Sequence, residues 1–130
     1  MRHRKAKEWE KQLKGMFDKI DIALEKKYGD RFKLHPVRPR HGKTSSRSMD
    51  GLFNVGASYS AGFGSKYGAG YVVDIRLATL ERVPAELKHE LRDRVQAMLL
   101  ELLPATFPGK ALQVDKERQH LRIHGDLSLD

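Results

Sequence analysis

The stretch LFNVGASYSA, residues 52–61, alternates apolar and small polar side chains without a break. Its apolar positions share odd numbers: Phe53, Val55, Ala57, Tyr59 and Ala61. Because successive side chains of a strand point to opposite faces, this pattern predicts a strand with one face on the core. Residues 71–79, YVVDIRLAT, repeat it, so the two segments are expected to pair antiparallel. The shared face should lie under helices, with Val55, Tyr59, Val73 and Ile75 at its centre.

An amphipathic helix is predicted on each side of this pair of strands. Over residues 5–28, one apolar stripe recurs every three or four positions, and Gly29 ends it. The stripe consists of Trp9, Leu13, Met16, Phe17, Ile20, Leu24 and Tyr28. A second stripe follows Val83-Pro84 and is expected to end at Pro104, since proline breaks a helix interior. It consists of Leu87, Leu91, Val95, Met98, Leu99 and Leu102.

Two further segments complete the predicted architecture. Residues 32–37 favour a short strand, bounded by Pro36 and Pro39, and residues 112–123 favour a hairpin that turns at DKERQ. The order is then α-(β)-β-β-α-β-β, with the parentheses marking the short strand. Interleaved helices and antiparallel strands predict an α+β fold: a two-layer sandwich of an antiparallel sheet and two amphipathic helices. The length, 130 residues, suits a single domain over residues 1–130.

The net charge of +8 is confined to the first part of the chain. Residues 1–50 carry 15 Lys and Arg against 7 Asp and Glu, whereas residues 51–130 carry 10 of each. Such a division indicates an anionic partner at one end, nucleic acid or a membrane surface. A solvated helix face explains it equally well on charge alone.

The basic loop at residues 38–50 carries most of the argument for nucleic acid. Residues 31–47 hold six Lys and Arg without an acid: Arg31, Lys33, Arg38, Arg40, Lys43 and Arg47. Polyanion binding requires several cations that reach successive phosphates, and nearby serine and threonine hydroxyls add donors. These six residues are therefore predicted to contact phosphates.

A glycine-rich loop at residues 60–70, SAGFGSKYGAG, separates the two alternating strands. The favoured interpretation is a long mobile hairpin loop, since glycine permits positive φ. The alternative is a ligand-contacting loop, in which Lys66 supplies charge and Phe63 and Tyr67 offer stacking faces for single-stranded bases. On this alternative, the three residues complete the predicted nucleic-acid site.

Motifs for catalysis and metal binding are incomplete. GKT at 42–44 lacks the leading glycine of a phosphate-binding loop, because Val37 stands there. His89-Glu90 begins a zinc-protease motif, but Asp93 replaces its second histidine. His120, Arg122 and His124 lie at alternate positions and so share one face of the predicted strand. The favoured interpretation is that this face is exposed. No catalytic or metal-binding residue is assigned and no cofactor is expected, so an enzyme is the less favoured class.

These observations predict a small basic nucleic-acid-binding domain, with RNA or single strands favoured. The alternative is an assembly module that docks an acidic protein partner, and a weaker one is a small enzyme that holds a phosphorylated ligand at the glycine-rich loop. The chain has no cysteine, no apolar run long enough to span a membrane, and no apolar segment typical of a secretory signal. A cytoplasmic location is therefore expected, with no membrane partner.

Overall fold

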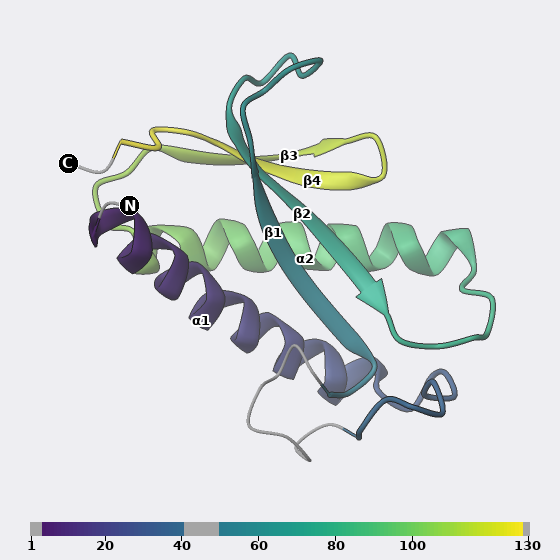
Figure 1. Ribbon diagram of the computed structural model, residues 1–130. Helices are drawn as coiled ribbons and strands as arrows, with labels where there is room; N and C mark the ends of the chain where they lie inside the picture. Colours follow the sequence, from purple (N-terminus) through teal and green to yellow (C-terminus); the bar gives the residue numbers. More distant parts are fainter. Residues whose placement is uncertain (1–3, 41–49, 129–130) are drawn as a thin grey trace.

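The computed structural model describes residues 4–40 and 50–128 (Figure 1). It contains α1 (Arg4–Tyr28), β1 (Phe53–Ser60), β2 (Gly70–Leu77), α2 (Ala85–Thr106), β3 (Leu112–Glu117) and β4 (His120–Gly125). The four strands form one antiparallel sheet in the order β1-β2-β4-β3, and both helices lie on one side of it. The predicted α+β sandwich is confirmed. In the parts of the chain that the structure describes, no helix is both long and apolar enough to cross a membrane.

The chain consists of two consecutive αββ halves that meet at the centre of the sheet. β1 pairs with β2 in the first half, and β3 pairs with β4 in the second. Within the sheet, the halves join where β2 pairs with β4, from the pair Gly70–His124 to the pair Val73–Leu121. Beyond Val73 the two hairpins diverge, so they cross like the arms of an X in Figure 1.

The core fills the space between the sheet and the helices. All seven members of the predicted α1 stripe are buried, and they belong to one core cluster with Val55, Val73 and Leu121 of the sheet. Trp9 stacks on Phe107 with ring centroids 4.4 Å apart, which joins the start of α1 to the end of α2.

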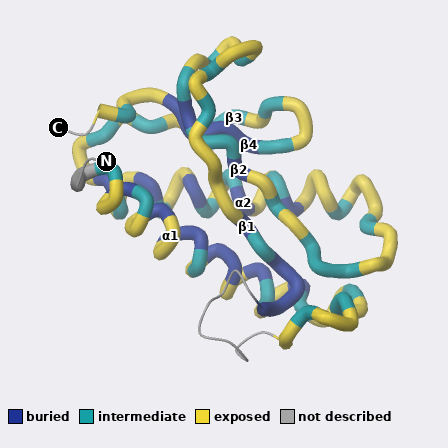
Figure 2. Tube along the Cα trace, viewed as in Figure 1, coloured by how far each residue is buried: buried dark blue, intermediate teal, exposed yellow. Residues whose placement is uncertain are grey.

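Tyr59 contradicts the predicted core face, because it is 63% exposed whereas Val55 and Val73 are buried. α1 contacts β1 near Phe53 and then diverges from it, so no helix lies over the far end of the strand (Figure 2). Tyr59 instead packs edge-on against Tyr71, with ring centroids 5.8 Å apart. The alternating pattern therefore predicted correctly which face of the sheet Tyr59 lies on, but it predicted incorrectly that a helix covers this residue.

Two predicted boundaries are also wrong. Residues 32–37 form no strand, because the segment makes single bonds in place of a ladder: the His35 amide donates to the Ala78 carbonyl at 2.8 Å. α2 continues through Pro104 to Thr106. Proline removes only the bond to the carbonyl of Leu100, a residue exposed to solvent in the final turns, so the helix tolerates the loss.

β1 lies at the edge of the sheet, and two acids of α1 cover part of it. Glu25 Oε1 accepts a bond from the Phe53 amide at 2.7 Å, and Asp21 Oδ1 accepts one from the Val55 amide at 2.9 Å. These carboxylates replace the missing neighbouring strand, which protects the edge from unwanted pairing.

Candidate nucleic-acid interface

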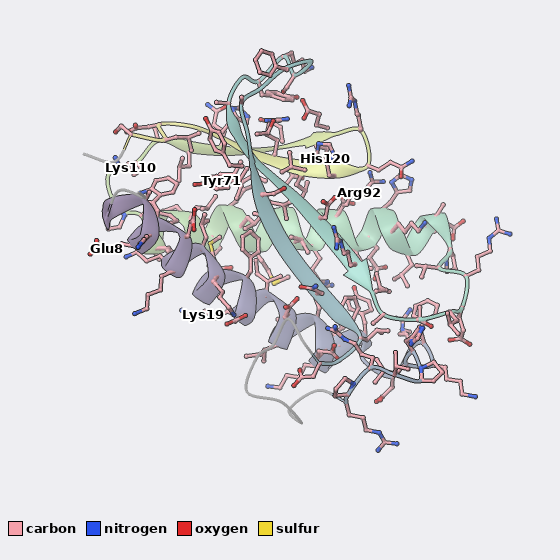
Figure 3. All side chains as sticks on the ribbon, viewed as in Figure 1. Glu8, Lys19, Tyr71, Arg92, Lys110 and His120 are labelled. Carbon is pink, nitrogen blue, oxygen red and sulfur yellow. The ribbon has the colours of Figure 1, made fainter. Side chains whose placement is uncertain are left out.

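The outer face of α1 and the segment that follows it form a surface that is rich in exposed cations. We call this surface the basic band. It consists of Lys7, Lys11, Lys14, Lys19, Lys26, Lys27, Arg31, Lys33 and Arg40, all exposed. Lys19 projects from α1 away from the sheet (Figure 3). Between Lys7 and Lys26 the helix rises about 28 Å at ~1.5 Å per residue.

Folding makes the basic band more positive than the sequence count implies. Of the acids in the same part of the chain, Asp21 and Asp50 are buried, and Glu25 is directed at the Phe53 amide. Only Glu8 and Asp30 are exposed to the same degree as the nine cations. Burial also raises the pKa of Asp21 to about 7, which reduces its negative charge near neutral pH.

Tyr28 holds the C-terminal end of the basic band in place. Its ring lies 5.2 Å from the Arg31 guanidinium and 5.8 Å from that of Arg94. Its hydroxyl donates to Glu90 at 2.5 Å and accepts from Arg94 at 3.0 Å. Burial and the bond to Glu90 raise the pKa of Tyr28, so the phenol stays neutral. α2 thereby fixes the point from which Arg31 extends.

Arg38 has an internal role, unlike its neighbours in the predicted site. Its Nε donates to the Gly51 carbonyl at 2.9 Å and its Nη2 donates to the Asp50 carbonyl at 3.0 Å. The Gly51 amide donates to Pro39 at 2.9 Å beside it. Arg38 therefore joins the two ends of the basic loop, and its donors point inward. Lys43 and Arg47 lie outside the described residues.

The glycine-rich loop lies at the opposite end of the β1–β2 hairpin from the segment that follows α1, residues 29–40, which includes Arg31, Lys33 and Arg40 (Figure 1). β1 has eight residues, which span roughly 27 Å at ~3.4 Å each. Phe63 is 96% exposed at the tip of the loop. Lys66 lies 5.1 Å from the ring centroid of Tyr67. The structure thus divides the predicted site into two separate surfaces.

The glycine-rich loop packs on the helix-free face of the sheet through Glu117. Ser65 Oγ donates to Glu117 Oε2 at 2.5 Å, and Arg122 Nε donates to Glu117 Oε1 at 2.7 Å. Arg122 Nη1 also donates to the Gly68 carbonyl at 3.1 Å. These donors lower the pKa of Glu117 to about 2, Ser65 contributing most and Arg122 next. Glu117 is therefore ionised at neutral pH and anchors the loop.

The histidine face of β4 is covered, so its interpretation as an exposed strand face is wrong. Arg122 is 4% exposed and His124 is 8% exposed. Tyr67 stacks on His124 with ring centroids 4.7 Å apart, and His124 Nε2 lies 2.6 Å from Asp115 Oδ2. The loop returns over the sheet and shields both residues. The signal in the sequence was the pairing of opposite charges across the hairpin, Asp115 with Arg122.

Close packing explains two glycines of this loop. A Cβ on Gly62, whose φ is +98°, would lie 2.5 Å from the Gly68 carbonyl carbon. A Cβ on Gly70 would lie 2.2 Å from the Ile123 carbonyl oxygen. The glycines therefore let the loop close on itself and let β2 approach β4.

The helix-free face of the sheet holds the glycine-rich loop in place and is poorly suited to catalysis. Glu117 is permanently ionised near neutral pH and surrounded by donors, so it is a poor proton acceptor. Within residues 4–40 and 50–128, no three His, Asp or Glu side chains gather in a way that could hold a metal ion. The basic band is thus the strongest candidate for a functional surface.

A comparison with known proteins places this two-layer α+β domain in a family. The chain belongs to the family described as "Uncharacterised protein", whose model matches residues 4–125. A relative from Borreliella burgdorferi, named "Uncharacterized protein", is 33% identical over 106 residues, which cover 82% of this chain and 83% of the relative. No solved structure matches the chain.

Proposed function

We propose that this protein binds nucleic acid through the phosphate backbone, with the basic band as its contact surface. The observation that carries the proposal is the nine exposed cations of residues 6–40, opposed by only two equally exposed acids. Surface cations that reach successive phosphates release counterions on binding and supply most non-specific affinity. Such contacts position the protein without reading the base sequence.

RNA or a single strand is the favoured ligand within this proposal. Phe63 is the most exposed aromatic side chain in the described residues, and an exposed ring can stack on any unpaired base. A strand that joins the Arg31 end of the band to this ring must run at least the length of β1, roughly 27 Å. A nucleic-acid ligand and the absence of cysteine fit a cytoplasmic protein.

The test compares two variants that lose the same charge. The band variant changes Lys11, Lys19, Lys26 and Arg31 to glutamine. The control variant changes four exposed cations of the second half, Arg76, Arg82, Lys88 and Arg118, to glutamine. Fluorescence anisotropy with single-stranded RNA and duplex DNA at several salt concentrations measures the slope of log affinity against log salt for each variant.

The band variant should lower that slope by roughly 3 to 4 on a duplex, since each phosphate contact contributes about 0.9, and by about 3 on a single strand. The control variant should keep most of the wild-type slope. Equal losses in both variants would show a net-charge effect without a defined surface. Failure of the wild-type protein to bind any polyanion at low salt would refute the proposal.

A further inference from the structure

A large cleft in the described part of the molecule lies where the two hairpins diverge. It encloses about 1140 Å³ between the second half of β2, residues 81–85, the start of α2 and the β3–β4 turn. Its floor is apolar, with Val73, Ile75, Leu77 and Leu91. Arg92 of α2 and His120 of β4 border it (Figure 3). The cleft exists because β2 pairs with β4 only from Gly70 to Val73.

Alternate residues of β2 direct their main-chain amides and carbonyls either toward β1 or into this cleft. The Ala78 amide donates to the Leu52 carbonyl at 2.7 Å, so even-numbered residues of β1 bond to β2. The Phe53 and Val55 amides donate to α1, which confirms that the main-chain groups of odd-numbered β1 residues point away from β2. Their partners in the register are Leu77 and Ile75. The main-chain amides and carbonyls of Ile75 and Leu77 therefore point into the cleft.

No residue that the structure describes forms a hydrogen bond with these groups of Ile75 and Leu77. Ile75 and Leu77 are two residues apart, which is the spacing at which an added antiparallel strand forms its hydrogen bonds. The outer edge of β1 differs, because Asp21 and Glu25 cover it at Val55 and Phe53. The cleft is thus an open position in the sheet, bordered by the start of α2.

The charge at the rim selects the side chains of an added strand. The cleft is lined by four Lys and Arg and by two acids: Arg82, Lys88, Arg92 and Arg118, with Asp74 and Glu81. Glu81 Oε2 accepts from the Lys33 amide at 2.6 Å, so one of its two oxygens is already engaged. The excess of cations favours acidic side chains, and the floor favours apolar ones at alternate positions.

We propose that this cleft binds an extended peptide segment of a partner protein, in which acidic and apolar residues alternate. The segment pairs with Ile75 and Leu77 as an additional strand. Its main chain supplies affinity, and its side chains supply specificity. This site is separate from the basic band and does not depend on nucleic-acid binding.

A second open edge in the same protein sharpens the test. By the same alternation, the amides of Ala57 and Tyr59, which follow Val55 on β1, point away from β2 at the outer edge of the sheet. The groove beside them, about 490 Å³, is lined by Glu10, Asp18 and Asp21 together with Lys14. This groove should reject an acidic peptide, whereas the cleft should accept it.

The experiment uses the full chain and three synthetic eight-residue probes. One alternates valine and glutamate, one alternates valine and lysine, and one is the valine–glutamate peptide with alternate main-chain amides N-methylated. Two-dimensional NMR with amide exchange measures affinity and locates the contact. The valine–glutamate probe should slow exchange at Ile75 and Leu77, and the lysine probe should bind there at least about fivefold more weakly.

N-methylation should weaken binding by roughly 30-fold, since it removes two hydrogen bonds. Lys88→Glu should weaken the valine–glutamate probe about fivefold, whereas the control Lys19→Glu on α1 should not. Absence of binding at millimolar probe, slowed exchange at Ala57 and Tyr59 in place of Ile75 and Leu77, or equal binding of the N-methylated peptide would each overturn the proposal. So would perturbation of the cleft by inorganic phosphate alone, with no response to peptide.

Discussion

The Asp21 carboxylate accepts a hydrogen bond from the Val55 amide at 2.9 Å, and it does so at an edge where β1 has no neighbouring strand. Glu25, one helical turn later, serves Phe53 in the same way at 2.7 Å. Four residues of helix rise about 6 Å and two residues of strand about 6.8 Å, so the two repeats match. A pair of acids four residues apart on a helix can therefore cover two amides of an adjacent strand edge.

Asp21→Asn should change how stability depends on pH. Burial raises the pKa of Asp21 from 3.8 to about 7, so the folded state holds this proton more tightly than the unfolded state. The free energy of unfolding should then fall as pH rises from about 4 to about 7. Asparagine keeps an oxygen for the Val55 amide and cannot ionise, so the variant should lose this fall. The difference at pH 8 should reach on the order of 4 kcal/mol at most.

Urea denaturation of both proteins at pH 4 to 8 measures this effect. Asp18→Asn is the matched control, because Asp18 lies on the same helix near the surface and pairs with Lys14 at 3.3 Å. Parallel pH profiles for wild type and Asp21→Asn would contradict the prediction.

Arg38→Ala and Arg40→Ala should separate structure from binding. Arg38 donates to two main-chain carbonyls, so its loss should reduce stability by about 1.5–3 kcal/mol. Arg40 is exposed, and its loss should change stability by less than about 0.5 kcal/mol. Arg40→Ala should lower the salt slope of nucleic-acid binding by about 0.9 on a duplex, and Arg38→Ala should leave it unchanged. Chemical denaturation and anisotropy test the pair, and the reverse assignment would show that Arg38 contacts phosphate.

Glu117→Gln should release the glycine-rich loop. The carboxylate accepts from both Ser65 and Arg122, and a neutral amide accepts more weakly and offers only one oxygen. Amide exchange over residues 62–68 should accelerate at least tenfold while exchange at Val73 stays constant. The pKa of Glu117 falls from 4.5 to about 2, so the wild-type anchor should be fully present above about pH 4.5 and lost as pH falls through about 2.

Glu101→Gln, an exposed change on α2, is the control for the loop. The interpretation favoured by the sequence was a long mobile hairpin loop at residues 60–70. For residues 62–70, rapid exchange already present in the wild type would support that view and would show that the Glu117 contacts do not hold the loop.

Gly70→Ala and Gly56→Ala should differ although both glycines lie in strands of one hairpin. A Cβ at Gly70 would lie 2.2 Å from the Ile123 carbonyl oxygen, whereas a Cβ at Gly56 would meet nothing within 4 Å. Gly70→Ala should lower stability by about 1–3 kcal/mol, the usual range for overpacking. Gly56→Ala should be neutral or stabilise by up to about 1 kcal/mol. Thermal unfolding measures both, and equal effects would contradict the close approach of β2 to β4.

Phe63→Ala should weaken nucleic-acid binding in a length-dependent way. To join Arg31 to the tip, a single strand must run at least the length of β1, roughly 27 Å, or about eight stacked nucleotides at ~3.4 Å each. Twelve-residue RNA should lose about 1–3 kcal/mol of affinity, and four-residue RNA and duplexes should lose little. Anisotropy with both lengths tests this, and an equal loss at the two lengths would place the contact elsewhere.

Local periodicity determined much of this fold in advance. Every residue of the predicted α1 stripe is buried, and the strands at 53–60 and 70–77 pair as predicted, because the repeat of a helix or strand decides which side chains share a face. The excess of positive charge in the first 50 residues is likewise readable from composition. These properties depend on neighbours in the chain.

The outcomes that sequence reasoning missed depend on where distant elements end. Tyr59 has the parity of a core residue but lies beyond the reach of α1, whereas Arg122 and His124 have the parity of an exposed face but lie under a returning loop. Arg38 is one more cation in the sequence, yet it bonds to carbonyls twelve and thirteen residues away. Periodicity assigns a face to each residue, and only the packing of whole elements decides whether anything covers that face.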